Sequence, residues 1–189
     1  MNTLSTIKKS IICAICIALC YVFPLIFHVF GTSAGSVFCP MHIPVFICGL
    51  ICGWPYGLMC GLAGPSMSCV LTSMPPVAML PSMTVELITY GVVSGLLSTY
   101  IHTKNTYIDL YISLISGIVC GRILSGIAKA FIFTGGKNYS FAMWISGSVI
   151  TSWPGTLIQL IFIPSIIVGL MKAHLIPERY DNNTFNKKK

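Results

Sequence analysis

The chain has 189 residues, of which 55% are hydrophobic and 8% are charged, and its mean hydropathy is +0.86. A soluble domain carries about 25% charged residues on average, so this composition excludes a soluble domain and indicates an all-α integral membrane protein. At about 20 residues per membrane-spanning helix, the length suits about six transmembrane helices. We predict a single membrane domain at residues 1–180 and a basic, disordered cytoplasmic tail at residues 181–189.

The net charge of +7 arises from 11 Lys and Arg against 4 Asp and Glu, and most of the excess lies at the two ends. Lys8 and Lys9 precede the first apolar run, whereas Lys172, Arg179 and residues 187–189 follow the last one. Because Lys and Arg concentrate on the cytoplasmic side of membrane helices, we predict that both termini are cytoplasmic and that the number of spans is even. Basic tails of this kind contact anionic lipids, so we expect a lipid bilayer and no nucleic acid as their partner.

The first predicted span covers residues 11–30. Within it, Ala14 and Ala18 have the small-xxx-small spacing that lets another helix approach closely. Residues 31–41 follow as an uncharged outer loop rich in Gly and Ser, which is typical of a lid over a cavity. We therefore expect a face for a partner helix on the first span and a covered site beyond its outer end.

The stretch from residue 38 to residue 85 contains no charged residue, and Pro and Gly interrupt its apolar runs. A bilayer tolerates such interruptions only where protein or a water-filled cavity satisfies the freed backbone groups, so we interpret this stretch as the wall of a pocket. Two runs in it, 42–52 and 55–72, predict a helix pair with a tight cytoplasmic turn. The alternative is one span followed by a re-entrant segment that is broken at Gly64 and Pro65.

Three further spans complete the predicted bundle. An outer loop at 73–81 carries three prolines, which exclude a helix interior. The spans that follow are predicted at 82–101, 107–133 and 141–170, the last with a kink at Pro154.

Glu86, Arg122 and Lys129 are ionisable residues that lie well inside these spans. Such groups are expensive in a membrane, face protein or water, and mark functional sites. Arg122 and Lys129 are seven residues apart, close to two helical turns, so they share one face. We expect Glu86 at the depth of Lys129 and paired with it. The surplus positive charge suits a small carboxylate; the alternative is a structural network with Lys129 reaching the interface.

Three more residues are candidates for substrate binding. His42 begins a short helix beside the predicted lid, where it either binds a ligand or closes the helix terminus. Trp144 and Trp153 either stack on an aromatic substrate or belong to the interfacial belt of aromatic residues. We expect Trp153 to lie deeper, which makes it the better stacking candidate.

Eight of the nine cysteines lie inside apolar runs, where Cys is most simply a small hydrophobe. Cys13 with Cys16, and Cys48 with Cys52, have close spacings, but neither pair has a His or carboxylate at ligand spacing in its own run. We therefore predict no metal, no redox site and no cofactor. Membrane hydrolases and transferases need paired carboxylates or a nucleophile with a base, and Glu86 has no acidic partner, so we predict that the protein is not an enzyme.

Taken together, these features resemble the substrate-binding S components of energy-coupling factor (ECF) transporters. The similarity rests on the basic N-terminus, the Ala14 and Ala18 spacing, the long loop after the first span, and the Gly-Trp-Pro-Tyr-Gly run at residues 53–57. The run is similar to the Gly-Pro turn between the second and third helices of the family, although here Trp54 replaces the Gly that directly precedes Pro in many members.

The resemblance implies a six-helix subunit in a prokaryotic plasma membrane that binds a water-soluble vitamin or precursor from outside. It implies docking through Ala14 and Ala18 on a T component, toppling in the membrane, and inward release driven by two ATPase subunits. The surplus cation favours nicotinate first and pantothenate next, with pyridoxine or hydroxymethylpyrimidine as uncharged candidates. Two alternatives stay open: a stand-alone secondary transporter or channel that uses Glu86, and a structural membrane subunit without a ligand.

Overall fold

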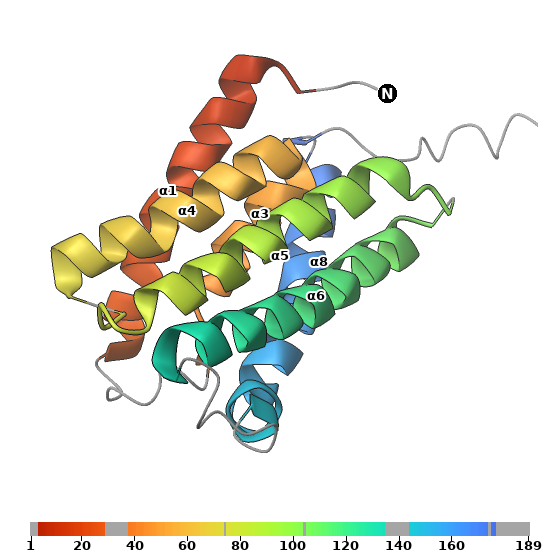
Figure 1. Cartoon of the computed structure of the whole chain (residues 1–189). Helices are drawn as coiled ribbons and strands as arrows, with labels where there is room; N and C mark the ends of the chain where they lie inside the picture. The colour runs from red at the N-terminus through yellow and green to blue at the C-terminus, as the bar shows by residue number, and fades with distance from the viewer. Residues whose placement is uncertain are drawn as a thin grey trace, which may run out of the picture.

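The computed structural model describes residues 4–28, 38–73, 75–103, 105–134, 144–173 and 175–176. Every regular element in these ranges is a helix, and together the helices form a bundle (Figure 1). They are α1 (Thr6–His28), α3 (His42–Cys52), α4 (Trp54–Thr72), α5 (Leu80–Tyr100), α6 (Thr106–Thr134), the π-helix η1 (Ser146–Ile150) and α8 (Trp153–Lys172). The prediction of an all-helical membrane bundle is confirmed.

Four of the helices in the described ranges are long and apolar enough to cross a membrane. These candidate spans are Thr6–Ile26, Leu80–Tyr100, Thr106–Phe131 and Trp153–Lys172. The helix His42–Cys52 is apolar but shorter. The bundle therefore combines full-length spans with a short helix whose first residues lie inside the protein.

The predicted helix pair is confirmed, with α3 ending at Cys52 and α4 beginning at Trp54. Gly53 between them has φ 94, a conformation that glycine adopts without the steric penalty of a side chain. Pro55 occupies the first turn of α4, where its missing N–H has no helical partner to lose. Because α4 continues through Pro65, the re-entrant alternative is wrong.

The last predicted span is not one continuous helix. The π-helix η1 ends at Ile150, Ser152 leaves helical geometry with φ −99 and ψ 9, and α8 starts afresh at Trp153. Pro154 in the first turn of α8 favours a helix start over a kink, because proline fixes φ and lacks the N–H that a helix interior needs. The prediction of a single helix over 141–170 with a kink at Pro154 is therefore wrong.

Helix α5 lies between α4 and α6 in Figure 1 and also packs against α3. Glycines allow this close packing: a Cβ on Gly91 of α5 would come within 2.9 Å of the Cα of Gly57 on α4. A Cβ on Gly49 of α3 would likewise meet the Gly91 backbone carbon at 3.2 Å. The close approach of α3 to α5 brings the first turn of α3 beside the polar residues of α5.

The predicted loop at 31–41 lies mostly outside the described residues, as do residues 135–140 and the tail from residue 177 onward. The structure therefore leaves the lid and tail predictions untested.

Candidate functional site

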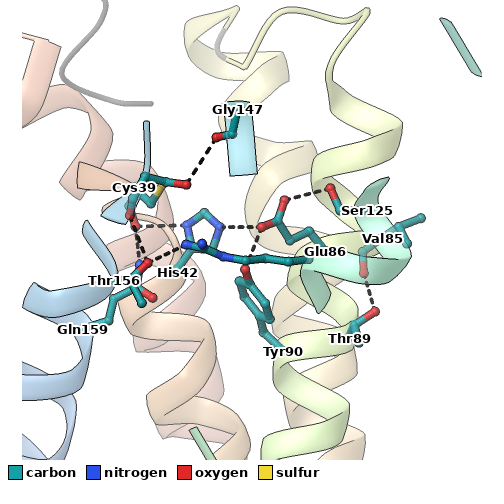
Figure 2. Close-up of polar contacts among 12 residues, drawn as sticks. Cys39, His42, Val85, Glu86, Thr89, Tyr90, Ser125, Gly147, Thr156 and Gln159 are labelled. Atoms are coloured by element: carbon teal, nitrogen blue, oxygen red, sulfur yellow. Dashed lines mark hydrogen bonds and ion pairs between the residues drawn. The ribbon is translucent and has the colours of Figure 1, made fainter. Parts of the chain in front are cut away.

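Polar side chains from four helices gather where the start of α3 meets α5, α6 and α8 (Figure 2). The cluster consists of His42, Glu86, Tyr90, Arg122, Ser125, Thr156 and Gln159. Three of the residues predicted for substrate binding, His42, Glu86 and Arg122, are among them. We call this set the polar cluster.

Glu86 is the most connected member of the polar cluster. The Tyr90 hydroxyl, one turn further along α5, donates to Oε1 at 2.6 Å, and the Ser125 hydroxyl of α6 donates to Oε2 at 2.9 Å. The Nε2 atom of His42 lies 3.8 Å from Oε1. Figure 2 shows the carboxylate between the His42 ring and Ser125. Glu86 thus has partners on α3, α5 and α6, so its position is set by the protein itself.

His42 links the start of α3 to this carboxylate. Its Nδ1 atom is 3.0 Å from the carbonyl oxygen of Cys39. A carbonyl oxygen only accepts, so Nδ1 carries a proton in this arrangement and Nε2 is the nitrogen that faces Glu86. The ring also lies 5.1 Å from the Tyr90 ring, which stacks on Phe46 at 4.7 Å. Aromatic faces therefore form one wall of the polar cluster.

The Cys39 carbonyl is shared between two helices. Besides His42 at the start of α3, the side-chain amide of Gln159 on α8 donates to it at 3.5 Å. Cys39 has φ 48, a left-handed conformation that is uncommon for a residue with a side chain. Such strain concentrates at ligand sites and persists only where surrounding contacts hold it. Here the contacts from His42 and Gln159 hold the Cys39 carbonyl.

Arg122 is held at two points but keeps one donor unused. Its Nη2 donates to the Thr156 hydroxyl at 2.5 Å, and its carbonyl oxygen accepts from the indole N–H of Trp144 at 3.1 Å. The Nε–H is buried and has no hydrogen-bond partner among the described residues. An unsatisfied buried donor costs about 1–3 kcal/mol, and more when it is charged. A bound acceptor at this point would remove that penalty.

Lys129 lies one turn beyond Ser125 on α6 and acts electrostatically on both Glu86 and Cys39. A direct ion pair between Lys129 and Glu86, which we expected, is not among the contacts of the described residues. The register of α6 against α5 explains this, because it brings the Ser125 hydroxyl to the carboxylate and leaves Lys129 one turn further along. The positive charge of Lys129 still contributes to the field of the polar cluster.

The two tryptophans differ in position. Trp144 lies beside Arg122 and over Gly126, where the indole occupies the space that a Cβ would need. Trp153, which we expected to be the deeper residue, is the first residue of α8 and is 57% exposed. Trp144 is therefore the tryptophan that adjoins the polar cluster.

Four members of the polar cluster were not among the predicted site residues: Tyr90, Ser125, Thr156 and Gln159. Tyr90 is recognisable in retrospect, because it follows Glu86 by four residues and such pairs are neighbours on a helix. Gly121 of α6 provides the space for its ring, since a Cβ there would overlap the Tyr90 ring. The other three are single polar residues in apolar helices, and only the packing of α6 and α8 identifies them.

Asp109 is a further buried acidic residue, which was not among the predicted site residues. It lies near the start of α6, is fully buried, and accepts hydrogen bonds from the backbone N–H of Thr103 at 3.0 Å and from the Thr103 hydroxyl. These contacts tie the α5–α6 connection to the first turn of α6. Asp109 therefore has a structural role at the helix connection.

Comparison with known proteins agrees with this architecture. Residues 8–176 match the family model described as "ECF transporter, substrate-specific component". Searches of curated proteins and of solved structures gave no match. The family match extends from the first turn of α1 to the end of the described chain after α8. The chain belongs to the family of substrate-specific components of ECF transporters.

Proposed function

We propose that this protein captures a small carboxylate-bearing vitamin or vitamin precursor from outside the cell, with Arg122 as the residue that binds the carboxylate. Its family makes it the substrate-binding subunit of an ECF transporter. The observation that carries the proposed substrate class is the buried Arg122 Nε–H, which lacks a hydrogen-bond partner within the described structure. A carboxylate oxygen is the acceptor that such a donor favours.

The charge balance of the site supports an anion. Glu86 already accepts hydrogen bonds from Tyr90 and Ser125 and lies beside His42, so the protein itself stabilises this carboxylate. Arg122 and Lys129 supply two positive charges to the same region against this one negative charge, and Thr156 and Trp144 hold Arg122 in place. The Arg guanidinium can bind both oxygens of a carboxylate in one plane, which a Lys ammonium does not do.

The surroundings of the cluster favour a substrate with a flat ring. His42 and Tyr90 present aromatic faces within the polar cluster, and the Trp144 indole adjoins it. Aromatic rings pack favourably in offset or tilted geometries. Nicotinate combines a ring with one carboxylate and is our first candidate. Pantothenate, which has the carboxylate without the ring, comes next, followed by the uncharged pyridoxine and hydroxymethylpyrimidine.

Delivery into the cell requires partners, which we propose to be a T component and two ATPase subunits in a prokaryotic plasma membrane. The helix α1 has a suitable outer face: Ala14 and Ala18 are exposed there beside Ile11 and Ile15, each of which is 54% exposed. Small residues let a second helix approach closely within a bilayer. We propose this face as the docking surface for the T component.

A stand-alone transporter that uses Glu86 as a proton carrier is less well supported. A proton carrier must release and regain its proton during each cycle. Glu86 accepts hydrogen bonds from two hydroxyls and lies beside His42, an arrangement that holds a carboxylate in place. A Glu86→Gln variant tests this rival: loss of proton-coupled uptake with unchanged substrate binding would favour it over the capture function.

The test is a thermal-shift panel on the detergent-purified protein with nicotinate, pantothenate, pyridoxine and hydroxymethylpyrimidine. A ligand that binds only the folded state stabilises it by about 2.7 kcal/mol at 100 times its Kd. We expect one of the two carboxylates to raise the melting temperature of the wild type and of Lys172→Ala, a control at the far end of α8. The shift should disappear in Arg122→Ala. A shift that persists unchanged in Arg122→Ala would contradict the proposal.

A further inference from the structure

Six of the nine cysteines line a single interface, where α1 packs on α3 and α4. They are Cys13, Cys16 and Cys20 on α1, Cys48 and Cys52 on α3, and Cys60 on α4. Each is at most 4% exposed and each is present as a thiol. We call this set the thiol interface.

The spacing of the cysteines explains how they meet. Cys13, Cys16 and Cys20 follow one another at intervals of three and four residues, which places them on one face of α1. Cys48 and Cys52 are four residues apart and therefore share a face of α3. The opposite face of α1 carries Ala14 and Ala18 and is exposed. The thiols are thus the inner contact surface of α1.

One backbone carbonyl connects all three helices. The thiols of Cys13 on α1 and Cys48 on α3 donate to the same carbonyl oxygen, that of Tyr56 on α4, at 3.7 Å and 3.4 Å. Because both sulfurs contact one acceptor, Cys13 and Cys48 are the thiols that meet between α1 and α3.

One end of the thiol interface adjoins the basic start of α1. The Cys52 thiol donates to the carbonyl oxygen of Lys9 at 3.6 Å, and Lys9 is one turn before Cys13. Lys8 beside it is exposed. Cys13 therefore lies one helical turn from the basic start of α1.

Packing alone needs only the size of a cysteine side chain, whereas facing thiols on two helices also provide the reactants for a disulfide. We propose that Cys13 and Cys48 form a modification site, at which a hydroperoxide joins the two thiols in a disulfide that links α1 to α3. This inference does not depend on the identity of the transported substrate.

The reaction balances with hydrogen peroxide as the two-electron oxidant. One sulfur attacks a peroxide oxygen, the O–O bond breaks, and a sulfenic acid and one water form. The second sulfur attacks the sulfenic sulfur, the S–O bond breaks, and the departing hydroxide takes the proton of the second thiol and leaves as a second water. Two thiols and one peroxide thus give one disulfide and two waters, and a dithiol reductant reverses the link.

The link would join two helices with different roles. Helix α3 carries Cys48 and begins with His42 of the polar cluster, whereas α1 carries the exposed Ala14 and Ala18. A disulfide between Cys13 and Cys48 would fix the helix that bears the proposed docking surface to the helix that contributes to the site. Oxidation would therefore restrain movement of α1 relative to the substrate site.

The experiment counts thiols in the full-length protein in detergent. The protein is treated with hydrogen peroxide, denatured, and labelled with N-ethylmaleimide before intact mass measurement. Without peroxide, nine adducts are expected, one for each cysteine. After peroxide, the loss of two thiols should leave seven of the nine adducts, and dithiothreitol should restore all nine. Peptide mapping of the wild type should identify the Cys13–Cys48 link.

Variants locate the disulfide. In Cys13→Ala and in Cys48→Ala the peroxide-dependent loss of two adducts should disappear. Cys69→Ala is the matched control, because Cys69 is a buried cysteine outside the thiol interface, and this variant should still lose two. No loss of adducts in the wild type, a disulfide mapped to another pair, or an unchanged loss in Cys13→Ala would each overturn the proposal. Peptide mapping of the disulfide in the wild type tests the proposal even if a variant fails to fold.

Discussion

Helix α3 belongs to two regions in which buried polar atoms are stabilised in different ways. At its start, His42 joins a polar cluster in which the charged groups depend on particular partners, such as the Tyr90 and Ser125 hydroxyls on Glu86. In its second half, Cys48 and Cys52 enter an interface of thiols, which are weak donors and pack as small hydrophobes. This comparison indicates that the residues at the start of α3 are constrained by their charged partners, whereas those in its second half are constrained mainly by side-chain size.

The largest expected effect comes from removing the charge at the centre of the polar cluster. Glu86→Ala leaves Tyr90 and Ser125 without their acceptor and removes the carboxylate that faces His42. Breaking a buried charge network in this way costs about 3–5 kcal/mol. We expect a loss of that size in the free energy of unfolding, measured by denaturant titration in mild detergent. A loss as small as that of a thiol-interface variant would remove the contrast between the two regions.

A medium effect is expected from removing a single donor. Tyr90→Phe keeps the ring that stacks on Phe46 but deletes the hydroxyl that donates to Glu86. Hydrogen bonds to charged groups contribute about 1.5–3 kcal/mol, so the free energy of unfolding should fall by about that amount. Phe46→Leu serves as a comparison that changes packing while keeping the hydrogen bond. If Tyr90→Phe were neutral, the hydroxyl would not hold the Glu86 carboxylate.

The smallest effect is expected at the thiol interface under reducing conditions. Cys48→Ala removes one sulfur atom from a contact of small side chains, and typical single substitutions cost about 1 kcal/mol. The same denaturant titration with a reductant present checks this value. A loss above about 3 kcal/mol, in the range of breaking a buried charged pair, would show that the thiols are as specifically required as the charged groups.

Local sequence signals predicted much of the fold. Gly53 and Pro55 marked the turn between α3 and α4, and the lengths of the apolar runs located α5 and α6 to within a few residues. The break before α8 was missed because Ser152 and the π-helix η1 carry no strong breaking signal, so Pro154 looked like a kink in one long helix. A proline in an apolar run is compatible either with a kink inside a helix or with the first turn of a new helix, and the sequence alone does not distinguish the two.

The site was only partly predictable for a geometrical reason. His42, Glu86 and Arg122 stood out as polar residues in apolar runs, and the structure brings all three into one cluster. Which residue faces Glu86 from α6 depends on the register between two helices, and that register favours Ser125 over Lys129. The rotation of each helix likewise decides that Trp144 adjoins the cluster. Neither register nor rotation can be derived from the spacing of residues within one helix.

The thiol interface shows the same limit. The spacing of Cys13, Cys16 and Cys20 predicts one common face on α1, but it does not predict that Cys48 of α3 lies opposite that face. Sequence patterns therefore predict faces of helices, whereas the pairing of faces is a property of the packed bundle.

The most direct test of the central claim compares each carboxylate with an uncharged relative of the same shape. Isothermal titration would measure the binding of nicotinate against nicotinamide, and of pantothenate against pantothenol, to the wild type and to Arg122→Ala. For one of the two pairs, we predict that the carboxylate binds to the wild type about 10–150-fold more tightly than its uncharged relative does. This ratio of affinities corresponds to the free energy of one hydrogen bond to a charged group. That preference should vanish in Arg122→Ala. Equal affinity for both members of each pair, or a preference that survives in Arg122→Ala, would contradict the claim that Arg122 binds the carboxylate of the substrate.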